Sequence, residues 1–134
     1  MNSAVQADNV PSLRLREIVG ANGVGVITDW LSRDGGARAK FHVRIGNLRS
    51  VPRTSWNKKQ FHKLKDADGI CEIKWKSGDR QWCALGYDKD GYFVMLLGCT
   101  HKEDVYDPKN CIQTARTRRD EVQQGKRQII EYRE

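Results

Sequence analysis

Apolar and polar residues alternate in two stretches of the chain, and this period of two predicts β-strands. The first stretch is LRLREIV, residues 13–19, which a turn, ANGVG, follows. The second is GICEIKWKS, residues 69–77. Its alternation divides the side chains between two faces, with Cys71, Ile73 and Trp75 on one and Ile70, Glu72 and Lys74 on the other.

From residue 69 onward the pattern predicts a three-stranded antiparallel meander. Ser77-Gly78-Asp79 is a tight hairpin signal at the end of the strand at 69–77. The next strand is RQWCALGY, residues 80–87, and a second hairpin turn follows at residues 88–91. YFVMLLGCT, residues 92–100, is almost entirely apolar, which is typical of a central strand.

Between the two alternating stretches, apolar residues recur every three to four positions, which predicts helices. One helix is predicted over residues 24–34, where Asp34-Gly35-Gly36 ends it, and a second over residues 37–49. VPRTS, residues 51–55, is a break. The next segment, WNKKQFHKLKD at residues 56–66, is predicted to be a short helix or a turn.

A third helix is predicted near the C-terminus, with Asp107 as its cap, Pro108 at its first position and Gly125 at its end. The basic tail that follows, residues 126–134, is either an added strand or a disordered end. Residues 1–12 are expected to be a flexible leader, so residues 13–125 are predicted to form one domain.

This order of elements predicts an α+β domain: a compact antiparallel β-sheet with N-terminal helices packed on one face and a C-terminal helix. The other face of the sheet is then expected to be exposed. The residues expected on that face are Glu72, Lys74, Arg80 and Trp82.

Charge adds a candidate partner to this picture. The chain has a formal net charge of +7, and residues 36–82 hold twelve Lys or Arg against four Asp or Glu. A concentrated positive field favours a polyanion, of which RNA and DNA are the commonest. The alternative is a basic face that is simply solvated. No apolar stretch approaches the ~18 residues of a membrane span, and no predicted helix shows a strong apolar face opposite its charges, so membrane binding is the less favoured alternative. The N-terminus lacks the basic-then-apolar pattern of a secretory signal, so we expect a cytoplasmic protein.

The four cysteines, Cys71, Cys83, Cys99 and Cys111, form no CxxC pair. Three fall in separate apolar runs and the fourth on the last predicted helix, so each is interpreted as a small buried apolar residue. A zinc site and disulfides are the less favoured alternatives.

Three consecutive segments resemble the RelE/HigB-like toxin family, especially its phage-derived HigB-type branch. These are LKDADGICEIKW, then GDRQWCALGYDKDGYFVMLLGCTHKEDVYDP, then CIQTARTRRDEV, and the resemblance is continuous from about Leu64 to Val122. It implies the toxin of a type II toxin–antitoxin module, which cleaves mRNA, usually on the ribosome, and is silenced by a cognate antitoxin. It implies mRNA and ribosomal RNA as partners and no cofactor.

No cluster of carboxylates in the sequence argues for a two-metal mechanism. The remaining route to RNA cleavage uses the 2′-hydroxyl of the RNA as the nucleophile. This route needs a base for the hydroxyl proton, an acid for the 5′ oxygen and cations around the phosphorus. An aromatic side chain that stacks on the splayed base would assist it.

Five residues are the candidates for this chemistry. Lys74 stands where the family has an arginine, and Arg80 is the nearest candidate for its second-strand arginine, although a gapless alignment places that position nearer Trp82 or Cys83. His101 and Lys102 fall where the family has basic residues after its last strand, and Tyr106 offers a hydroxyl for the phosphate. The alternatives are ordinary roles: a solvated lysine, a loop histidine and a packing tyrosine.

The candidates for RNA binding are Lys58, Lys59, Lys63, Lys76, Trp82, Arg116 and Arg119. Trp82 either stacks on a base or packs in the core, and a solvated helical face is the alternative for the arginines. His42 and His62 are interpreted as surface residues. The alternative function is a non-catalytic nucleic-acid-binding or phage-derived interaction protein on the same fold. Glu103, which replaces the second lysine of the family's pair, favours that alternative.

Overall fold

The computed structural model describes residues 13–103 and 105–134. Its strands are β1 (Leu15–Ile18), β2 (Phe61–Lys63), β3 (Cys71–Ser77), β4 (Arg80–Lys89), β5 (Tyr92–Lys102), β6 (Val105–Asp107) and β7 (Ile129–Glu131). Its helices are α2 (Val26–Leu31), α3 (Gly35–Arg49), the 3-10 helix η1 (Arg53–Ser55) and α4 (Cys111–Gln123). The seven strands form one open, mostly antiparallel sheet, which confirms the predicted α+β class.

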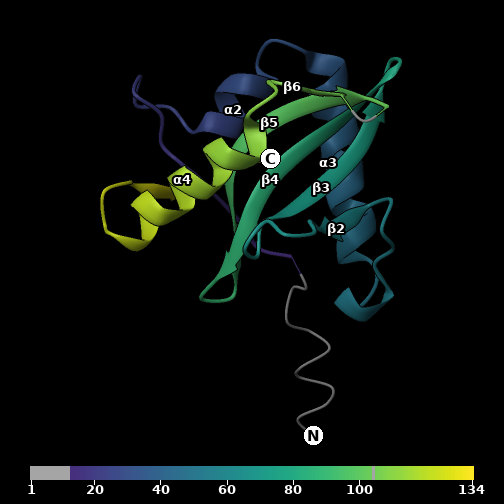
Figure 1. Cartoon of the computed structure of the whole chain (residues 1–134). Coiled ribbons are helices and arrows are strands. Elements are labelled where there is room, and N and C mark those ends of the chain that lie inside the picture. The colour runs from purple at the N-terminus through teal and green to yellow at the C-terminus, as the bar shows by residue number, and fades with distance from the viewer. Residues whose placement is uncertain (1–12, 104) are drawn as a thin grey trace, which may run out of the picture.

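The strands lie in the order β2-β3-β4-β5-β1-β7, and β6 pairs with the end of β5 (Figure 1). The predicted meander is present as β3, β4 and β5. β1 joins it beside β5 and runs parallel to that strand, with Leu15 opposite Phe93. β7 then pairs antiparallel with β1, with Glu17 opposite Ile130. Of the two alternatives for the tail, the added strand is therefore the one observed, and the tail is part of the sheet. The predicted leader, residues 1–12, lies outside the described residues.

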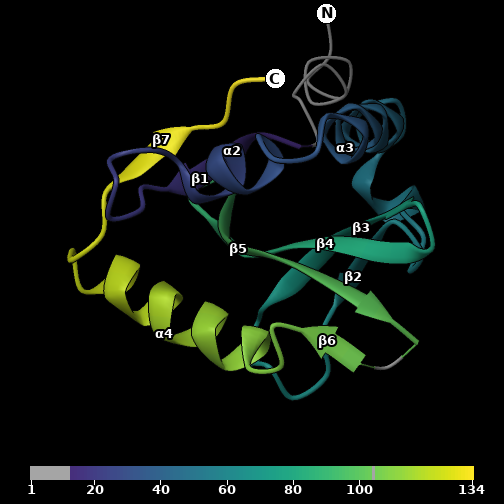
Figure 2. The same ribbon diagram turned by 90° about the horizontal axis from the view of Figure 1, so that it is seen from above.

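Helices cover both faces of the sheet. Figure 2 shows α2 and α3 on one side and α4 on the other. The prediction that one face would be exposed is wrong, because α4 packs on β4 and β5. The sheet alternation instead supplies apolar side chains to both sides, so both need a covering layer.

The core under α2 and α3 is built from the apolar stripe that the sequence shows. Ala37, Phe41, Ile45 and Leu48 recur at helical spacing on α3, and all four are fully buried. They pack against alternate residues of β3, namely Cys71, Ile73 and Trp75.

The core under α4 uses the opposite set of sheet residues. Cys83, Leu85, Val94 and Leu96 from β4 and β5 pack against buried residues of α4. Those residues are Cys111, Ala115 and Val122. All four cysteines of the chain are buried and free, as the sequence predicted.

Element boundaries differ from the predictions in the first half of the chain. The helix predicted over 24–34 is shorter, Val26–Leu31, and Gly35-Gly36 begin α3 instead of only ending α2. The side chain of Asp34 explains this start, because its carboxylate accepts a hydrogen bond from Ala37 N at 2.9 Å and so caps α3.

Two strands replace predicted non-strand segments. Phe61–Lys63, predicted as helix or turn, is strand β2, because it pairs with β3 and Phe61 packs against the core of α3. Val105–Asp107 is strand β6, so Asp107 and Pro108 do not start the last helix. That helix begins at Cys111, and its N-cap residue, Asn110, makes no side-chain capping bond.

No helix in the described ranges is both long enough and apolar enough to cross a membrane.

Candidate active site

The site is built around one buried carboxylate, Glu72, in the middle of β3. Its side chain points toward the α4 layer and the residue is only 2% exposed. Three polar side chains surround the two carboxylate oxygens. Tyr106 Oη lies 3.5 Å from Oε2, while His62 Nδ1 and Lys74 Nζ lie 3.7 Å and 3.8 Å from Oε1. We call these four residues, with His101, the Glu72 cluster.

Strand register explains how distant parts of the sequence meet here. His62 on β2 lies directly opposite Glu72 on β3. Lys74 is two residues after Glu72 on the same strand and so faces the same side. Tyr106 comes from β6, where it lies opposite His101 of β5. The short strands β2 and β6 thus bring their side chains to the long strand β3.

Tyr106 contacts both Glu72 and His101. Its ring stacks on the ring of His101, with centroids 4.8 Å apart and planes at 29°. Burial and then the nearby charge of Glu72 raise the pKa of Tyr106 well above its usual value. Its hydroxyl therefore keeps its proton at neutral pH and acts as a hydrogen-bond donor to the carboxylate.

His101 is enclosed. Its Nδ1 lies 2.9 Å from the backbone oxygen of Glu103. Its Nε2 is buried and has no hydrogen-bond partner among the described residues. Neither ring nitrogen is open to a substrate in this conformation, so the contact of His101 with the site is the stacking of its ring on Tyr106.

A basic cavity adjoins the cluster at Tyr106. It has a volume of about 490 Å³, and its wall contains Arg80, Lys102, Glu103, Tyr106 and Lys109, with Val105 and Asp107. Lys102 Nζ pairs with Asp79 Oδ2 at 3.2 Å, and both of these side chains are well exposed. An exposed pair of this kind is weak, so an incoming anion can compete with Asp79 for Lys102.

The five predicted catalytic residues therefore share one region of the molecule. Arg80, Lys102 and Tyr106 line the basic cavity, and Lys74 and His101 meet Tyr106 through Glu72 and through ring stacking. They come from four strands, β3, β4, β5 and β6. Arg80 lies opposite Ser77, which alternation places on the face of Trp75 and Trp82, so the prediction that Arg80 and Lys74 share one sheet face is wrong.

The predicted RNA-binding residues are more scattered. Lys58 and Lys59 are exposed in the turn before β2, and Lys76 is exposed on β3. Lys63 and Arg119 line a separate cavity of about 380 Å³ at the β2 edge. Trp82 faces α2: its ring lies 5.0 Å from that of Trp30 and 6.3 Å from that of Trp75. The expected position of Trp82 on a surface with Lys74 is therefore wrong, and the core alternative is the one observed.

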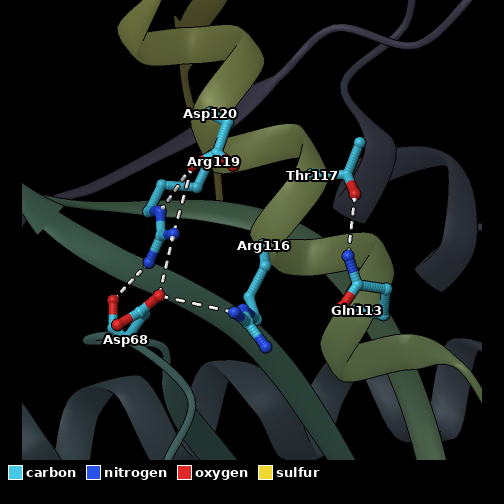
Figure 3. Close-up of polar contacts among 6 residues, drawn as sticks. All are labelled: Asp68, Gln113, Arg116, Thr117, Arg119 and Asp120. Atoms are coloured by element: carbon cyan, nitrogen blue, oxygen red, sulfur yellow. Dashed lines mark hydrogen bonds and ion pairs between the residues drawn. The ribbon is translucent and has the colours of Figure 1, made fainter.

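Arg116 and Arg119 attach α4 to the loop before β3 (Figure 3). Arg116 Nη2 lies 3.4 Å from Asp68 Oδ2, and Arg119 donates to the backbone oxygen of Asp68. Arg119 also pairs with Asp120 at 3.1 Å, and its side chain is only 11% exposed. These contacts give both arginines a structural role. Their predicted contact with RNA stays a prediction.

Two members of the cluster, Glu72 and His62, were not predicted as functional residues. The alternation of residues 69–77 placed Glu72 on the correct face, but that face was expected to be exposed. His62 was interpreted as a surface residue because β2 was not predicted as a strand. A strand at 61–63 paired with β3 was the signal that could have placed His62 beside Glu72.

Three thiols lie behind the cluster. Cys83 and Cys99 are opposite each other on β4 and β5. Contacts with Cys111 and Cys83, followed by burial, raise the pKa of Cys99, which keeps this thiol protonated. Within residues 13–103 and 105–134, no group of three His, Cys, Asp or Glu side chains has an arrangement that could hold a metal ion.

No protein-family model, curated protein or solved structure matches this chain. A buried carboxylate with an imidazole, an ammonium and a phenol around it can move protons, and the adjoining cations can hold an anionic substrate.

Proposed function

We propose that this chain is the toxin of a type II toxin–antitoxin module and cleaves mRNA as a metal-independent endoribonuclease. The RNA's own 2′-hydroxyl would be the nucleophile. Messenger RNA and ribosomal RNA would be its partners in the cytoplasm, and a cognate antitoxin protein would be its inhibitor. The resemblance of residues 64–122 to RelE/HigB-like toxins is one support for this proposal.

The observation that supports the proposal most is the meeting of Lys74 and Tyr106 at Glu72. Both side chains contact the same buried carboxylate, at 3.8 Å and 3.5 Å. Proton transfer needs groups within hydrogen-bond reach of one reacting phosphate, and only clustered residues satisfy this requirement.

The basic cavity supplies the second requirement of the chemistry. Negative charge grows on the phosphorane oxygens during the attack of the 2′-oxygen, and fixed cations stabilise it. Arg80, Lys102 and Lys109 line the cavity beside Tyr106. A phosphodiester held by them would place its reacting atoms next to the tyrosine.

The test is cleavage of single-stranded RNA by the purified chain in EDTA, with and without translating ribosomes. We expect cuts that leave a 2′,3′-cyclic phosphate, and no cuts in the same sequence with 2′-O-methyl groups. Induced expression should arrest growth, and primer extension should map breaks in mRNA.

A matched pair of variants locates the activity. Lys74→Met with Arg80→Gln should reduce cleavage by about 10²-fold or more, the size of effect typical of a lost general acid–base or charge-stabilising group. Lys40→Met with Arg38→Gln removes the same charge from exposed positions of α3, and it should leave cleavage intact. An absence of cleavage by the wild type both with purified RNA and on ribosomes would overturn the proposal.

A second candidate is a non-catalytic nucleic-acid-binding module. The enclosed ring of His101 favours it, because Nε2 is buried and Nδ1 bonds to Glu103. In this case, RNA would bind at Arg80 and Lys102 and remain uncut, so the same cleavage assay combined with a binding assay separates the two candidates.

A further inference from the structure

His62 is the histidine of this chain whose ring combines a carboxylate partner with access to solvent. Its Nδ1 faces Glu72 Oε1 at 3.7 Å. Its side chain is 37% exposed, whereas that of Glu72 is 3% exposed. The two nitrogens occupy different positions of the imidazole ring, so Nε2 is not the atom that faces the carboxylate, and it is the nitrogen left for a substrate.

The other two histidines do not have this arrangement. His101 has a buried Nε2 and an Nδ1 bound to the backbone of Glu103. His42 lies on α3, on the opposite side of the sheet, and its Nε2 is 2.8 Å from Tyr132 Oη. The sequence favoured His101 as a proton carrier, but the geometry favours His62.

We infer that His62 is the base that takes the proton of the 2′-hydroxyl, with Glu72 as its charge partner. This inference rests on the proposed ribonuclease function and names the proton-transfer group of the same site. Histidine suits the task, because an imidazole accepts and releases protons near neutral pH. The Glu72 carboxylate, 3.7 Å from Nδ1, is too far for a hydrogen bond, but its charge would stabilise the imidazolium that forms.

The reaction balances as follows. Neutral His62 accepts the 2′-hydroxyl proton at Nε2 while the 2′ oxygen bonds to phosphorus. The bond from phosphorus to the 5′ oxygen breaks, and that oxygen takes a proton from water. Protonated His62 then returns its proton to the resulting hydroxide. The products are a 2′,3′-cyclic phosphate and a 5′-hydroxyl.

Lys74 is placed to assist this step. Its ammonium lies 3.8 Å from the same carboxylate oxygen that His62 faces at 3.7 Å. The imidazole and the ammonium therefore gather around one atom, close enough to act on a single phosphodiester. Lys74 would neutralise the phosphate while His62 takes the proton.

Chemical rescue tests the inference. His62→Ala should reduce RNA cleavage by about 10²- to 10⁴-fold, the usual range for a general base. Free imidazole should restore part of the activity, because the exposed position leaves room for it. His42→Ala provides the matched control: we expect near-wild-type cleavage and no response to imidazole.

Two results would overturn the inference while the ribonuclease proposal stands. One is full cleavage by His62→Ala. The other is a loss that imidazole does not restore in a variant whose circular dichroism shows a folded chain, since this would mean that His62 only positions other groups.

If the wild type does not cleave RNA, a binding measurement can still test whether His62 lies at a phosphate site. Uridine 3′-monophosphate would be titrated into the isotope-labelled chain, and the imidazole signals followed by NMR. Shifts of the His62 signals, without shifts of His42, would support its position at a phosphate site even though the ribonuclease proposal had failed. Unmoved His62 signals would overturn the inference about His62 as well.

Discussion

Two charged side chains, Glu17 and Glu72, are buried in the described part of the chain, and their surroundings differ. Glu17 accepts short hydrogen bonds from Ile27 N at 2.8 Å, from Thr28 N at 2.9 Å and from Thr28 Oγ1 at 2.6 Å. It thereby caps α2 from a neighbouring strand. Glu72 has partners only at 3.5 to 3.8 Å. A carboxylate that is held loosely can exchange its partners, which suits a functional group.

This difference predicts that Glu→Gln lowers the free energy of unfolding by different amounts at the two positions. Glu17→Gln should lower the free energy of unfolding by roughly 2 kcal/mol, because hydrogen bonds to a charged group are worth about 1.5–3 kcal/mol. Glu72→Gln should cost about 1 kcal/mol or less, because its contacts are long and the amide avoids the desolvation cost of a buried charge. Urea unfolding of both variants measures the difference. A larger loss for Glu72→Gln would contradict the assignment of Glu17 as the structural carboxylate.

Tyr132 gives a prediction about alkaline pH. Burial raises its pKa to about 12, from about 10 for an exposed tyrosine. Folding thus favours the neutral phenol, so the stability that this group contributes is complete below pH 10. It is lost as the pH rises toward 12.

The measurement is urea unfolding of wild type and Tyr132→Phe at pH 9 and again near pH 11.5. The wild type should lose about 1–2 kcal/mol more than the variant between the two values, at about 1.4 kcal/mol for each unit of pKa difference. At pH 9 the variant itself should be slightly less stable, because it lacks the 2.8 Å contact with His42. Equal losses in the two proteins would show that Tyr132 titrates normally.

At the scale of elements, α2 depends on tertiary contacts. It has six residues, too few for an isolated helix to be stable in water. Its N-terminus is capped by Glu17, and Ile27 and Leu31 are fully buried. Trp30 then packs directly on β5 at Gly98, where an added Cβ would lie 2.1 Å from the indole ring.

Gly98→Ala should therefore push α2 away from the sheet. Overpacking of this kind lowers the free energy of unfolding by about 1–3 kcal/mol. Gly46→Ala is the matched comparison, because Gly46 lies inside α3 and an added Cβ there has no neighbour within 4 Å. That variant should be more stable by about 0.5–1 kcal/mol. Thermal unfolding of the two variants would show opposite shifts, and a stable Gly98→Ala would contradict the close packing of Trp30.

The sequence predicted the elements that are long enough for the spacing of their apolar residues to be recognised. β3, β4 and β5 have at least seven residues each, and α3 has a stripe of four buried residues. β2, β6 and β7 have three residues each, too few to show a side-chain period, and β7 pairs with β1 at the other end of the chain. The same limit applies to the site: Lys74, His101 and Tyr106 were found from their residue types and resemblance, whereas the His62–Glu72 contact needs the β2–β3 register.

At the scale of the whole molecule, α4 determines where the sheet can meet a substrate. It covers the middle of the face formed by β4 and β5, and its first residue, Cys111, is buried. The Glu72 cluster lies on the same side of the sheet, where Tyr106 of β6 reaches Glu72. The basic cavity is lined by Tyr106 and Asp107 of β6 and by Lys109, so both parts of the proposed site adjoin the segment that leads into α4.

With a net charge of +7, the chain is expected to bind RNA with an affinity that falls as the salt concentration rises. Each phosphate contact to a single strand adds about −0.7 to the slope of log K against log salt. Arg80→Gln with Lys109→Gln should reduce the steepness of that slope by about 1.4, if both cations of the cavity contact phosphates. Arg38→Gln with Lys40→Gln lowers the net charge equally on α3 and should leave the slope nearly unchanged. A 2′-O-methyl oligonucleotide, which the proposed reaction cannot cut, allows equilibrium titrations from low to moderate salt. Equal changes in slope for the two pairs of substitutions would mean that RNA responds to the diffuse charge of the whole molecule. The cavity would then not be the binding site.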